Sequence, residues 1–318
     1  MLKVALIGCG AHADEAHATP LAMYVADHPG ELTLAAACDV RLTAAEAFCQ
    51  RFGFAAAFED AQRMLDTVRP DAVWCVVPPQ FIAATAGRLL ERGIPTVIEK
   101  PLGVTLDEAR GLVAVARRTG TPHMVSVNRR FVPQLNRAIA WARERGPLQY
   151  VRITMLRDRR TEDDFLFGTG IHALDAARHI GGDVASASVA TLSQPPLTSR
   201  WHLIDLKFTS GARGRIDMLT TAGSHAENYE LLGEGYRVDL QTRLPRNPTA
   251  ALRCYQADKL VLEHLAPPDE LPQRARGELD ELQEFLTALK AHRPPNPSAA
   301  DILPSMELAF DLFARARA

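Results

Sequence analysis

Paired cysteine motifs, long apolar runs and lysine are all scarce in this sequence, and each scarcity excludes something. No apolar run approaches the ~20 residues of a membrane-spanning helix. The N-terminus reaches a glycine turn at Gly8, too early for a signal peptide. The cysteines are odd in number and lack C-x-x-C spacing, so neither a disulfide framework nor a metal site is expected. We expect a cytoplasmic protein with reduced cysteines, which are Cys9, Cys38, Cys49, Cys75 and Cys254.

Blocks of like charge are also missing. The formal net charge is −2 over 318 residues, and no basic cluster stands out. This balance argues against nucleic acid or an anionic membrane as the main partner. Hydrophobic residues at 47% and charged residues at 23% are ordinary for a globular protein. The length is sufficient for two domains, each with its own core.

Lysine is outnumbered by arginine, 5 to 31, which draws attention to where the lysines lie. Lys100 follows the short apolar stretch Val97–Ile98 and Glu99, and Pro101 ends the predicted strand directly after it. In parallel sheets, ligands bind at the carboxyl ends of the strands. A lysine retained there indicates chemistry that arginine cannot perform, namely giving up a proton. The alternative is an ordinary solvated lysine. A cis Lys100–Pro101 bond would fix the direction of the side chain.

A glycine turn follows the first predicted strand, residues 2–7. The segment Gly8-Cys9-Gly10-Ala11-His12-Ala13 has the pattern G-x-G-x-x-A and leads into a predicted helix. The first glycine permits a tight turn, the second lets the backbone approach a pyrophosphate, and the small alanine permits close packing of helix on strand. Following an N-terminal buried strand, this pattern predicts dinucleotide binding, with a chance turn as the alternative.

An acid ends the second predicted strand, residues 32–38. Asp39 stands where a ribose 2′-hydroxyl is held in dinucleotide-binding domains, and its charge repels a 2′-phosphate. NAD is therefore slightly favoured over NADP, although Arg41 could accept that phosphate. The alternative role of Asp39 is to cap the helix predicted over residues 43–52.

Strands and helices alternate up to about residue 125. Predicted strands 55–58, 71–77, 96–98 and 123–127 are separated by predicted helices 60–67, 81–92 and 105–118, and Pro78-Pro79 closes the strand that ends at 77. This alternation predicts an α/β domain with a parallel, doubly wound sheet over residues 1–125. Residues 126–318 change character. Predicted strands 148–157, 184–193, 200–209, 212–221, 226–242 and 251–265 indicate a second domain with a mostly antiparallel sheet. Predicted helices 275–292 and 299–316 complete the chain, and these last helices could pack back on the first domain.

A helix predicted between Gly168-Thr169-Gly170 and Gly181-Gly182 presents His172, Asp175 and His179 on one face. A metal site is disfavoured because two helical turns separate the outer residues too far for one tetrahedral ion. A structural role remains open, with Asp175 capping or pairing with arginine. A role of His172 as general acid or base also remains open.

Together these segments resemble the glucose–fructose oxidoreductase/inositol dehydrogenase (Gfo/Idh/MocA) family almost from end to end. The resemblance rests on the glycine turn, Asp39, Pro78-Pro79, Glu99-Lys100-Pro101, Asn128-Arg129-Arg130-Phe131 and His172-x-x-Asp175. It implies a Rossmann domain followed by a domain with a large open antiparallel sheet. It also implies a nicotinamide cofactor, a sugar, polyol or related substrate, and a homodimer or homotetramer formed through that sheet.

By that resemblance, Lys100 and His172 are the catalytic pair. The cofactor would contact Gly8, Cys9, Gly10, Ala11, His12, Ala13, Asp39, Arg41, Pro78, Pro79 and Glu99, and the substrate would contact Asn128, Arg129 and Asp175. One departure matters: many family dehydrogenases carry an Asp four residues before the histidine, where this chain has Gly168. Asp163 or Asp164 could supply the carboxylate, or Lys100 and His172 could act without it.

The predicted function is therefore hydride transfer between NAD(P) and a secondary alcohol or carbonyl. Two alternatives remain. One is an NAD-dependent glycosidase, and the other is a catalytically weak or inactive dinucleotide-binding regulatory protein, which the glycine at position 168 keeps open.

Overall fold

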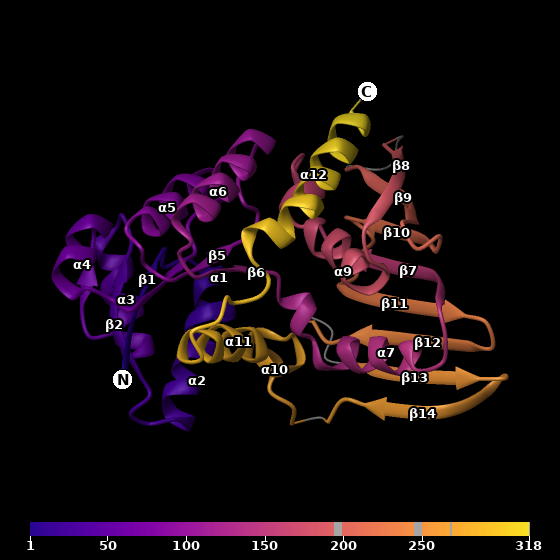
Figure 1. The fold of residues 1–318 in the computed structure, drawn as a ribbon, viewed down its shortest axis with the longest axis horizontal. Coiled ribbons are helices and arrows are strands. Elements are labelled where there is room, and N and C mark those ends of the chain that lie inside the picture. Colours follow the sequence, from indigo (N-terminus) through magenta and orange to yellow (C-terminus); the bar gives the residue numbers. More distant parts are fainter. Residues whose placement is uncertain (194–198, 245–249, 268, 318) are drawn as a thin grey trace. The chain divides into compact units, whose positions relative to one another are not determined.

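The chain forms two compact units in a computed structural model that describes residues 1–193, 199–244, 250–267 and 269–317 (Figure 1). The first unit comprises Met1–Val127 and Glu278–Pro304, and the second comprises Asn128–Gly277 and the residues from Ser305 onward. The sequence predicted a division after residue 125. The units divide after Val127, and residues 278–304 return to the first unit.

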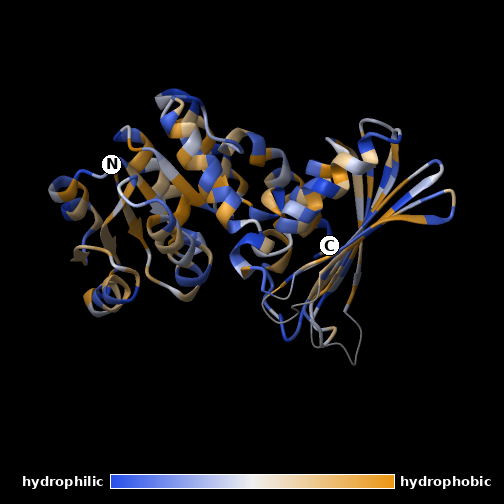
Figure 2. Cartoon of the chain, turned by 90° about the horizontal axis from the view of Figure 1, so that it is seen from below, coloured by the Kyte–Doolittle hydropathy of each residue, from blue (hydrophilic) through white to orange (hydrophobic). Residues whose placement is uncertain are grey.

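The first unit is built on a six-stranded, entirely parallel sheet of order β3-β2-β1-β4-β5-β6. This order confirms the predicted doubly wound sheet. Its central strands are buried on both faces, and Figure 2 shows hydrophobic residues along them. The strands are β1 (Leu2–Ile7), β2 (Leu32–Cys38), β3 (Ala57–Phe58), β4 (Ala72–Cys75), β5 (Thr96–Glu99) and β6 (His123–Ser126).

The helices of the first unit follow the strands in alternation. Thr105 and Glu108 form a capping box that begins α6, and Gly120, in the left-handed region, ends it. Trp74 of β4 packs against Phe285 of α11, with ring centroids 5.3 Å apart. The helices are α1 (Ala11–Ala13), the π-helix η1 (Asp14–Ala18), α2 (Thr19–Asp27), α3 (Leu42–Phe52), α4 (Ala61–Val68), α5 (Pro79–Glu91), α6 (Leu106–Thr119) and α11 (Glu278–Lys290).

The second unit carries an eight-stranded sheet of order β14-β13-β12-β11-β7-β10-β9-β8. All neighbouring pairs are antiparallel except β7 and β10, which confirms the predicted mostly antiparallel sheet. The strands are β7 (Leu148–Leu156), β8 (Val184–Leu192), β9 (Trp201–Phe208), β10 (Arg213–Leu219), β11 (Ala226–Gly233), β12 (Tyr236–Thr242), β13 (Ala251–Gln256) and β14 (Lys259–Leu265).

Two strands predicted as single elements are hairpins. The predicted strand 226–242 is β11 and β12, which turn at Gly235 with a φ of 75°. The predicted strand 251–265 is β13 and β14, joined by Ala257 and Asp258 with φ values of 47° and 64°. Two-residue turns with positive φ match the twist of antiparallel strands. Gly233-Glu234-Gly235 and Asp258 are the turn signals in the sequence that mark these two hairpins.

The helices of the second unit include one that the sequence did not predict, α7 (Pro133–Arg143). The predicted helix 275–292 is interrupted at Gly277, whose φ is 80°, and α10 and α11 lie on either side. Within the described ranges, no helix combines the length and the apolar character that crossing a membrane requires. The remaining helices of the second unit are η2 (Asn128–Phe131, a 3-10 helix), α8 (Phe165–Gly168), α9 (Ile171–Gly181) and α10 (Pro272–Ala275). The last helix, α12 (Ala299–Arg315), belongs to the first unit up to Pro304 and to the second from Ser305.

Candidate active site

The predicted glycine turn begins where the ends of strands β1 and β4 lie close together. Gly8 has a φ of 99°, and a Cβ at this position would lie 2.2 Å from the carbonyl oxygen of Val76. Only glycine therefore fits between the ends of β1 and β4. Beyond it, Gly10, Ala11 and His12 are exposed, whereas Ala13 is buried. The turn thus offers its backbone to solvent on one side and packs through its alanine on the other, as a dinucleotide cradle requires.

Asp39 is fixed at the end of β2, beside the glycine turn. Its Oδ2 accepts a hydrogen bond from the backbone N–H of Cys9 at 3.0 Å, and its Oδ1 accepts one from the N–H of Arg41, also at 3.0 Å. The Arg41 Nε lies 3.7 Å from the same Oδ1. Asp39 does not cap α3, whose N-cap position is Arg41. The carboxylate is thereby oriented at the strand end where a ribose is bound in sheets of this order.

The carboxyl ends of β4 and β5 add the other predicted residues of the first unit. Pro78 precedes α5, Pro79 is its first residue, and the carbonyl of Pro78 accepts the N–H of Phe81 at 2.8 Å. Glu99 ends β5, and the Lys100–Pro101 bond that follows is cis. Because all six strands are parallel, these residues lie along the same edge of the sheet as Gly8 and Asp39.

Glu99 is the centre of a cluster of basic groups. Its Oε1 lies 3.2 Å from Nε2 of His12 and 3.6 Å from Nζ of Lys100, and its Oε2 lies 3.0 Å from Nε2 of His17. Burial raises the pKa of the Glu99 carboxyl, but His12, His17 and Lys100 outweigh burial and hold that pKa well below its usual range. Glu99 is therefore a buried anion that binds three basic side chains.

Only one of the two histidines in this cluster was singled out from the sequence, and then only as part of the turn. The negative charge of Glu99 raises the pKa of His12, although burial opposes it. Burial lowers the pKa of His17, so His17 serves as a neutral hydrogen-bond partner. The π-helix η1 carries His17 five positions beyond His12, and no motif in the sequence marked that spacing.

The ligand atoms of His12, His17 and Glu99 lie within 4.8 Å of one another, close enough to surround a metal ion. The ammonium group of Lys100 beside Glu99 Oε1 supplies a positive charge at the same carboxylate. A divalent cation there would have to displace that charge, so the geometry favours a proton-sharing cluster over a metal site.

A second buried carboxyl lies behind this cluster. Glu281 of α11 accepts a hydrogen bond from the hydroxyl of Ser126 on β6 at 2.8 Å and is 4% exposed. Burial raises the pKa of the Glu281 carboxyl well above its usual range, which favours its protonated form. The two residues are far apart in the sequence, which explains why no motif revealed the pair.

In the second unit, the face of α9 that carries His172, Asp175 and His179 is divided among separate partners. Asp175 is 1% exposed and accepts hydrogen bonds from Nε and Nη2 of Arg130, both at 2.8 Å, and from the hydroxyl of Ser305. His179 Nε2 lies 3.2 Å from Oδ1 of Asn136. His172 is buried in the first turn of α9. The arginine pair is the structural alternative that the sequence left open for Asp175.

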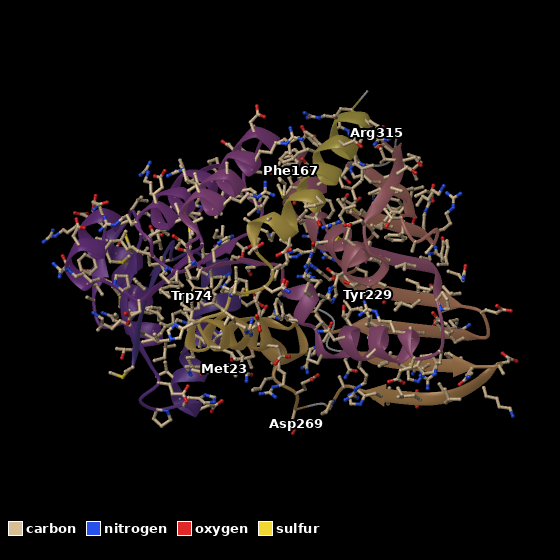
Figure 3. All side chains as sticks on the ribbon, in the orientation of Figure 1. Met23, Trp74, Phe167, Tyr229, Asp269 and Arg315 are labelled. Carbon is tan, nitrogen blue, oxygen red and sulfur yellow. The ribbon has the colours of Figure 1, made fainter. Side chains whose placement is uncertain are left out.

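Asn128 and Arg129, predicted to line the substrate, are bound into the unit itself. Arg129 donates from Nε and Nη2 to the two oxygens of Glu227, at 3.0 and 2.6 Å, and from Nη1 to Oδ1 of Asn128. Glu227 is 1% exposed and also pairs with Arg157 and with the hydroxyl of Tyr229, which Figure 3 labels. Burial raises the pKa of Glu227, yet the two arginines hold it well below its usual range. No motif in the sequence indicated this buried network.

Gly168, which lies four residues before His172, has a carboxylate beside it. A Cβ on Gly168 would lie 3.6 Å from Oδ2 of Asp164, and the Gly168 N–H donates to the Asp164 carbonyl at 2.8 Å. Asp163 instead pairs with Arg200 and Arg317 at 2.9 and 3.1 Å. Of the two acids that the sequence offered, Asp164 is the one beside position 168.

Lys100 belongs to the first unit and His172 to the second. Their meeting over one nicotinamide ring stays a prediction.

A comparison with protein families found a match that begins at residue 2 and ends at residue 128. Residues 2–128 match the model of an oxidoreductase family with an NAD-binding Rossmann fold. The chain is also 32% identical over 206 residues to D-glucoside 3-dehydrogenase of Escherichia coli K12. That match covers 59% of this chain and 56% of the relative, so the chain spans about half the length of this curated relative.

Solved structures with the same fold extend over nearly the whole chain. A dehydrogenase from Chromobacterium violaceum has a TM-score of 0.89 at 20% identity and covers 99% of this chain and 95% of its own. Levoglucosan dehydrogenase, in complex with NADH and L-sorbose, has a TM-score of 0.85 at 20% identity and covers 99% and 96%. At these identities the likeness is one of fold.

Proposed function

We propose that this chain is an NAD-dependent dehydrogenase of sugars or polyols. Its residues 2–128 match the model of the Gfo/Idh/MocA oxidoreductase family. The family match confirms the resemblance drawn from the sequence. The observation that carries the proposal is the placement of a lysine, paired with a buried glutamate, at the same sheet edge as the glycine turn. We further propose a cytoplasmic enzyme.

The first unit fits a dinucleotide. A Cβ at the exposed Gly10 would meet no atom within 4 Å, so the turn is open on that side, and Asp39 is oriented at the end of β2 to accept a ribose hydroxyl. When bound, a nicotinamide ring supplies a hydride acceptor at C4. The protein then has to hold the substrate and take one proton from its hydroxyl group.

Lys100 is proposed to take that proton, since an ammonium can deprotonate where a guanidinium cannot. Nζ of Lys100 receives the proton of the substrate hydroxyl while the carbon that bears this hydroxyl gives up its hydride, and the substrate becomes a carbonyl compound. His172 is proposed as the acid or base from the second unit. Asp175 accepts hydrogen bonds from Arg130 and Ser305, and we propose that these bonds hold the helix α9 that carries His172 in position. We propose that Asn128 and Arg129 line the substrate, with Arg129 held in place by its hydrogen bonds to Glu227.

A turnover screen tests this function. Nicotinamide absorbance is followed with NAD and a panel of free sugars, alkyl glycosides and polyols. Steady NADH formation with at least one class of secondary alcohol is expected. Cleavage of an aryl glycoside without net NADH formation would favour the glycosidase instead. Tight dinucleotide binding with no turnover across the panel would favour the regulatory protein.

We propose glycosides and related sugars as the substrate class because the matching Escherichia coli relative is named a D-glucoside 3-dehydrogenase. Levoglucosan dehydrogenase, whose solved structure contains NADH and L-sorbose, shares the fold. The direct comparison is kcat/KM for a methyl glycoside against the free sugar and an acyclic polyol of equal carbon number. A preference for the acyclic polyol would contradict this substrate class.

The cofactor preference should depend on Asp39. NAD is expected to bind more tightly than NADP, because the Asp39 carboxylate repels a 2′-phosphate and accepts a 2′-hydroxyl. Replacing Asp39 by serine is expected to reduce the ratio of NAD to NADP affinity by about tenfold, the effect of about 1.4 kcal/mol. Binding of both dinucleotides is measured by calorimetry. Asp60→Ser, on a residue that caps α4, is the matched control. An unchanged ratio in Asp39→Ser would contradict the role.

The carboxylate beside Gly168 should serve His172. We expect Asp164→Ala to lower kcat by about 10²-fold, the lower end of the usual effect of a lost acid–base partner. Adding Gly168→Asp to that variant is expected to restore much of the rate, because a Cβ at position 168 lies 3.6 Å from Oδ2 of Asp164, so the new carboxylate starts from beside the one that was removed. Asp163→Ala, which removes only exposed ion pairs, is the control. Equal rates in the two alanine variants would rule out Asp164 as the substitute.

We also propose a homo-oligomer formed through the second sheet. Its edge strand β14 exposes Leu260, Val261 and Leu265, at 48, 50 and 58%. An exposed apolar edge strand favours pairing with another chain. Sedimentation equilibrium is expected to show a dimer or tetramer, and a monomer at micromolar concentration would refute the proposal.

A further inference from the structure

His12 belongs to the glycine turn and also contacts the buried Glu99. It lies in the exposed part of the glycine turn, with 57% of its side chain accessible, and its Nε2 lies 3.2 Å from Oε1 of Glu99. Lys100 Nζ lies 3.6 Å from that same oxygen. One carboxylate oxygen is therefore shared by an imidazole from the cofactor turn and by the amine proposed to accept the substrate proton.

We propose that His12 is a positioning residue of the reaction centre, which competes with Lys100 for Glu99 and so makes the Lys100 amine release its proton more readily. The proposal rests on the proposed role of Lys100 as the base. It goes beyond the place of His12 in the glycine turn, where only backbone approach to the dinucleotide was expected.

The charges around His12 favour such competition. Glu99 faces it from the end of β5, and Lys100 follows on the same segment. From η1, His17 meets the His12 ring edge-on with centroids 5.7 Å apart, and Glu278 contributes a negative charge from α11. Glu99 raises the pKa of His12 whereas Lys100 lowers it. Because the interaction of two titrating groups is mutual, a proton on His12 disfavours a proton on Lys100.

The second oxygen of Glu99, Oε2, is bound by His17, and this contact keeps Oε1 between His12 and Lys100. His17 binds Oε2 at 3.0 Å and is buried, so Glu99 cannot turn away to serve Lys100 alone. Its burial also keeps the local dielectric low, which strengthens the coupling between His12 and Lys100. His12 and Lys100 are therefore two cationic partners for the same oxygen of Glu99, Oε1.

The test measures Lys100 directly. Its amine is acetylated competitively over a pH series in the protein without dinucleotide, and mass spectrometry reads the extent of reaction at Lys100. In His12→Leu the midpoint of reactivity is expected to rise by about one pH unit, the lower end of the effect of a neighbouring charge. His12→Gln, which can keep an N–H donor to Glu99 but carries no charge, is expected to give an intermediate midpoint. His28→Leu, on an exposed histidine of the same unit, should leave the midpoint unchanged.

Two further results decide the assignment. In a Glu99→Gln background, His12→Leu is expected to shift the midpoint by less, because the shared anion is gone. In turnover, the acid limb of the kcat/KM profile of His12→Leu should move in the same direction as the Lys100 midpoint.

A Lys100 midpoint that is the same in wild type and His12→Leu would overturn the proposal. So would a change in NAD affinity without a change in that midpoint, because it would confine His12 to cofactor binding. The acetylation experiment needs no substrate. Failure of the dehydrogenase assignment, seen as no turnover in the wild type, is therefore distinguishable from failure of this inference.

Discussion

Replacing Lys100 by alanine is expected to lower kcat by about 10²–10⁴-fold, the usual effect of removing an acid–base group. The binding of NAD should persist, because the glycine turn and Asp39 are separate from the amine. The measurement pairs steady-state turnover with calorimetric NAD binding for the same variant. Turnover by Lys100→Ala at the wild-type rate would refute the assignment of the base.

Lys100→Arg separates the two ways in which the lysine could act. Arginine keeps the positive charge beside Glu99 but does not give up a proton at accessible pH. If Lys100 accepts the substrate proton, the arginine variant should be as impaired as the alanine variant. Substantial turnover by Lys100→Arg would mean that charge alone suffices. Lys207→Ala, on an exposed lysine of β9, is the control for loss of a lysine elsewhere.

Replacing Glu227 by alanine is expected to destabilise the second unit by about 3–5 kcal/mol, the typical effect of leaving a buried charge without its partner. Arg129 and Arg157 both pair with this carboxylate, and their side chains are 14% and 3% exposed. Removing the anion would leave two largely desolvated guanidinium groups without it. Urea unfolding followed by circular dichroism measures the loss.

The matched control is Glu230→Ala on the same strand, β11. Glu230 is partly exposed, so its removal should change stability by no more than about 0.5 kcal/mol. Equal unfolding midpoints for the two variants would show that the Glu227 network contributes little.

Glu227 also predicts a pH dependence of stability. Its carboxyl pKa is lowered in the folded protein by Arg129 and Arg157 in spite of burial. A carboxyl with a lowered folded pKa contributes its full stability above the unfolded pKa of about 4.3, and loses that contribution as the pH falls through the folded value. The wild type should therefore lose stability more steeply than Glu227→Ala below about pH 4.

Residues close together in the sequence were the predictable part of the site. The glycine turn, Asp39 and Glu99-Lys100 each follow a buried strand directly, and parallel strands deliver their ends to one edge. Local sequence therefore determines both the sheet and the residues at its rim.

Partners that come from distant segments were not predictable. His17 reaches Glu99 only because η1 has a π-helical turn, and Glu281 reaches Ser126 only because α11 returns to the first unit. Arg129 pairs with Glu227, which lies 98 residues further along the chain. No local pattern encodes these pairings, since each depends on which surfaces the folded chain buries together.

An alternating α/β unit with a dinucleotide turn, a following sheet unit and a lysine at a strand end could all be predicted from the sequence, because they depend on short-range periodicity and on glycine and proline positions. Only the tertiary structure decided which charges the reactive groups meet. In the folded chain, Glu99 contacts His12, His17 and Lys100, and Asp164 lies beside Gly168. The physical reason is that burial and charge pairing act through space, so the proton affinity of a side chain depends on neighbours that the order of the chain does not reveal.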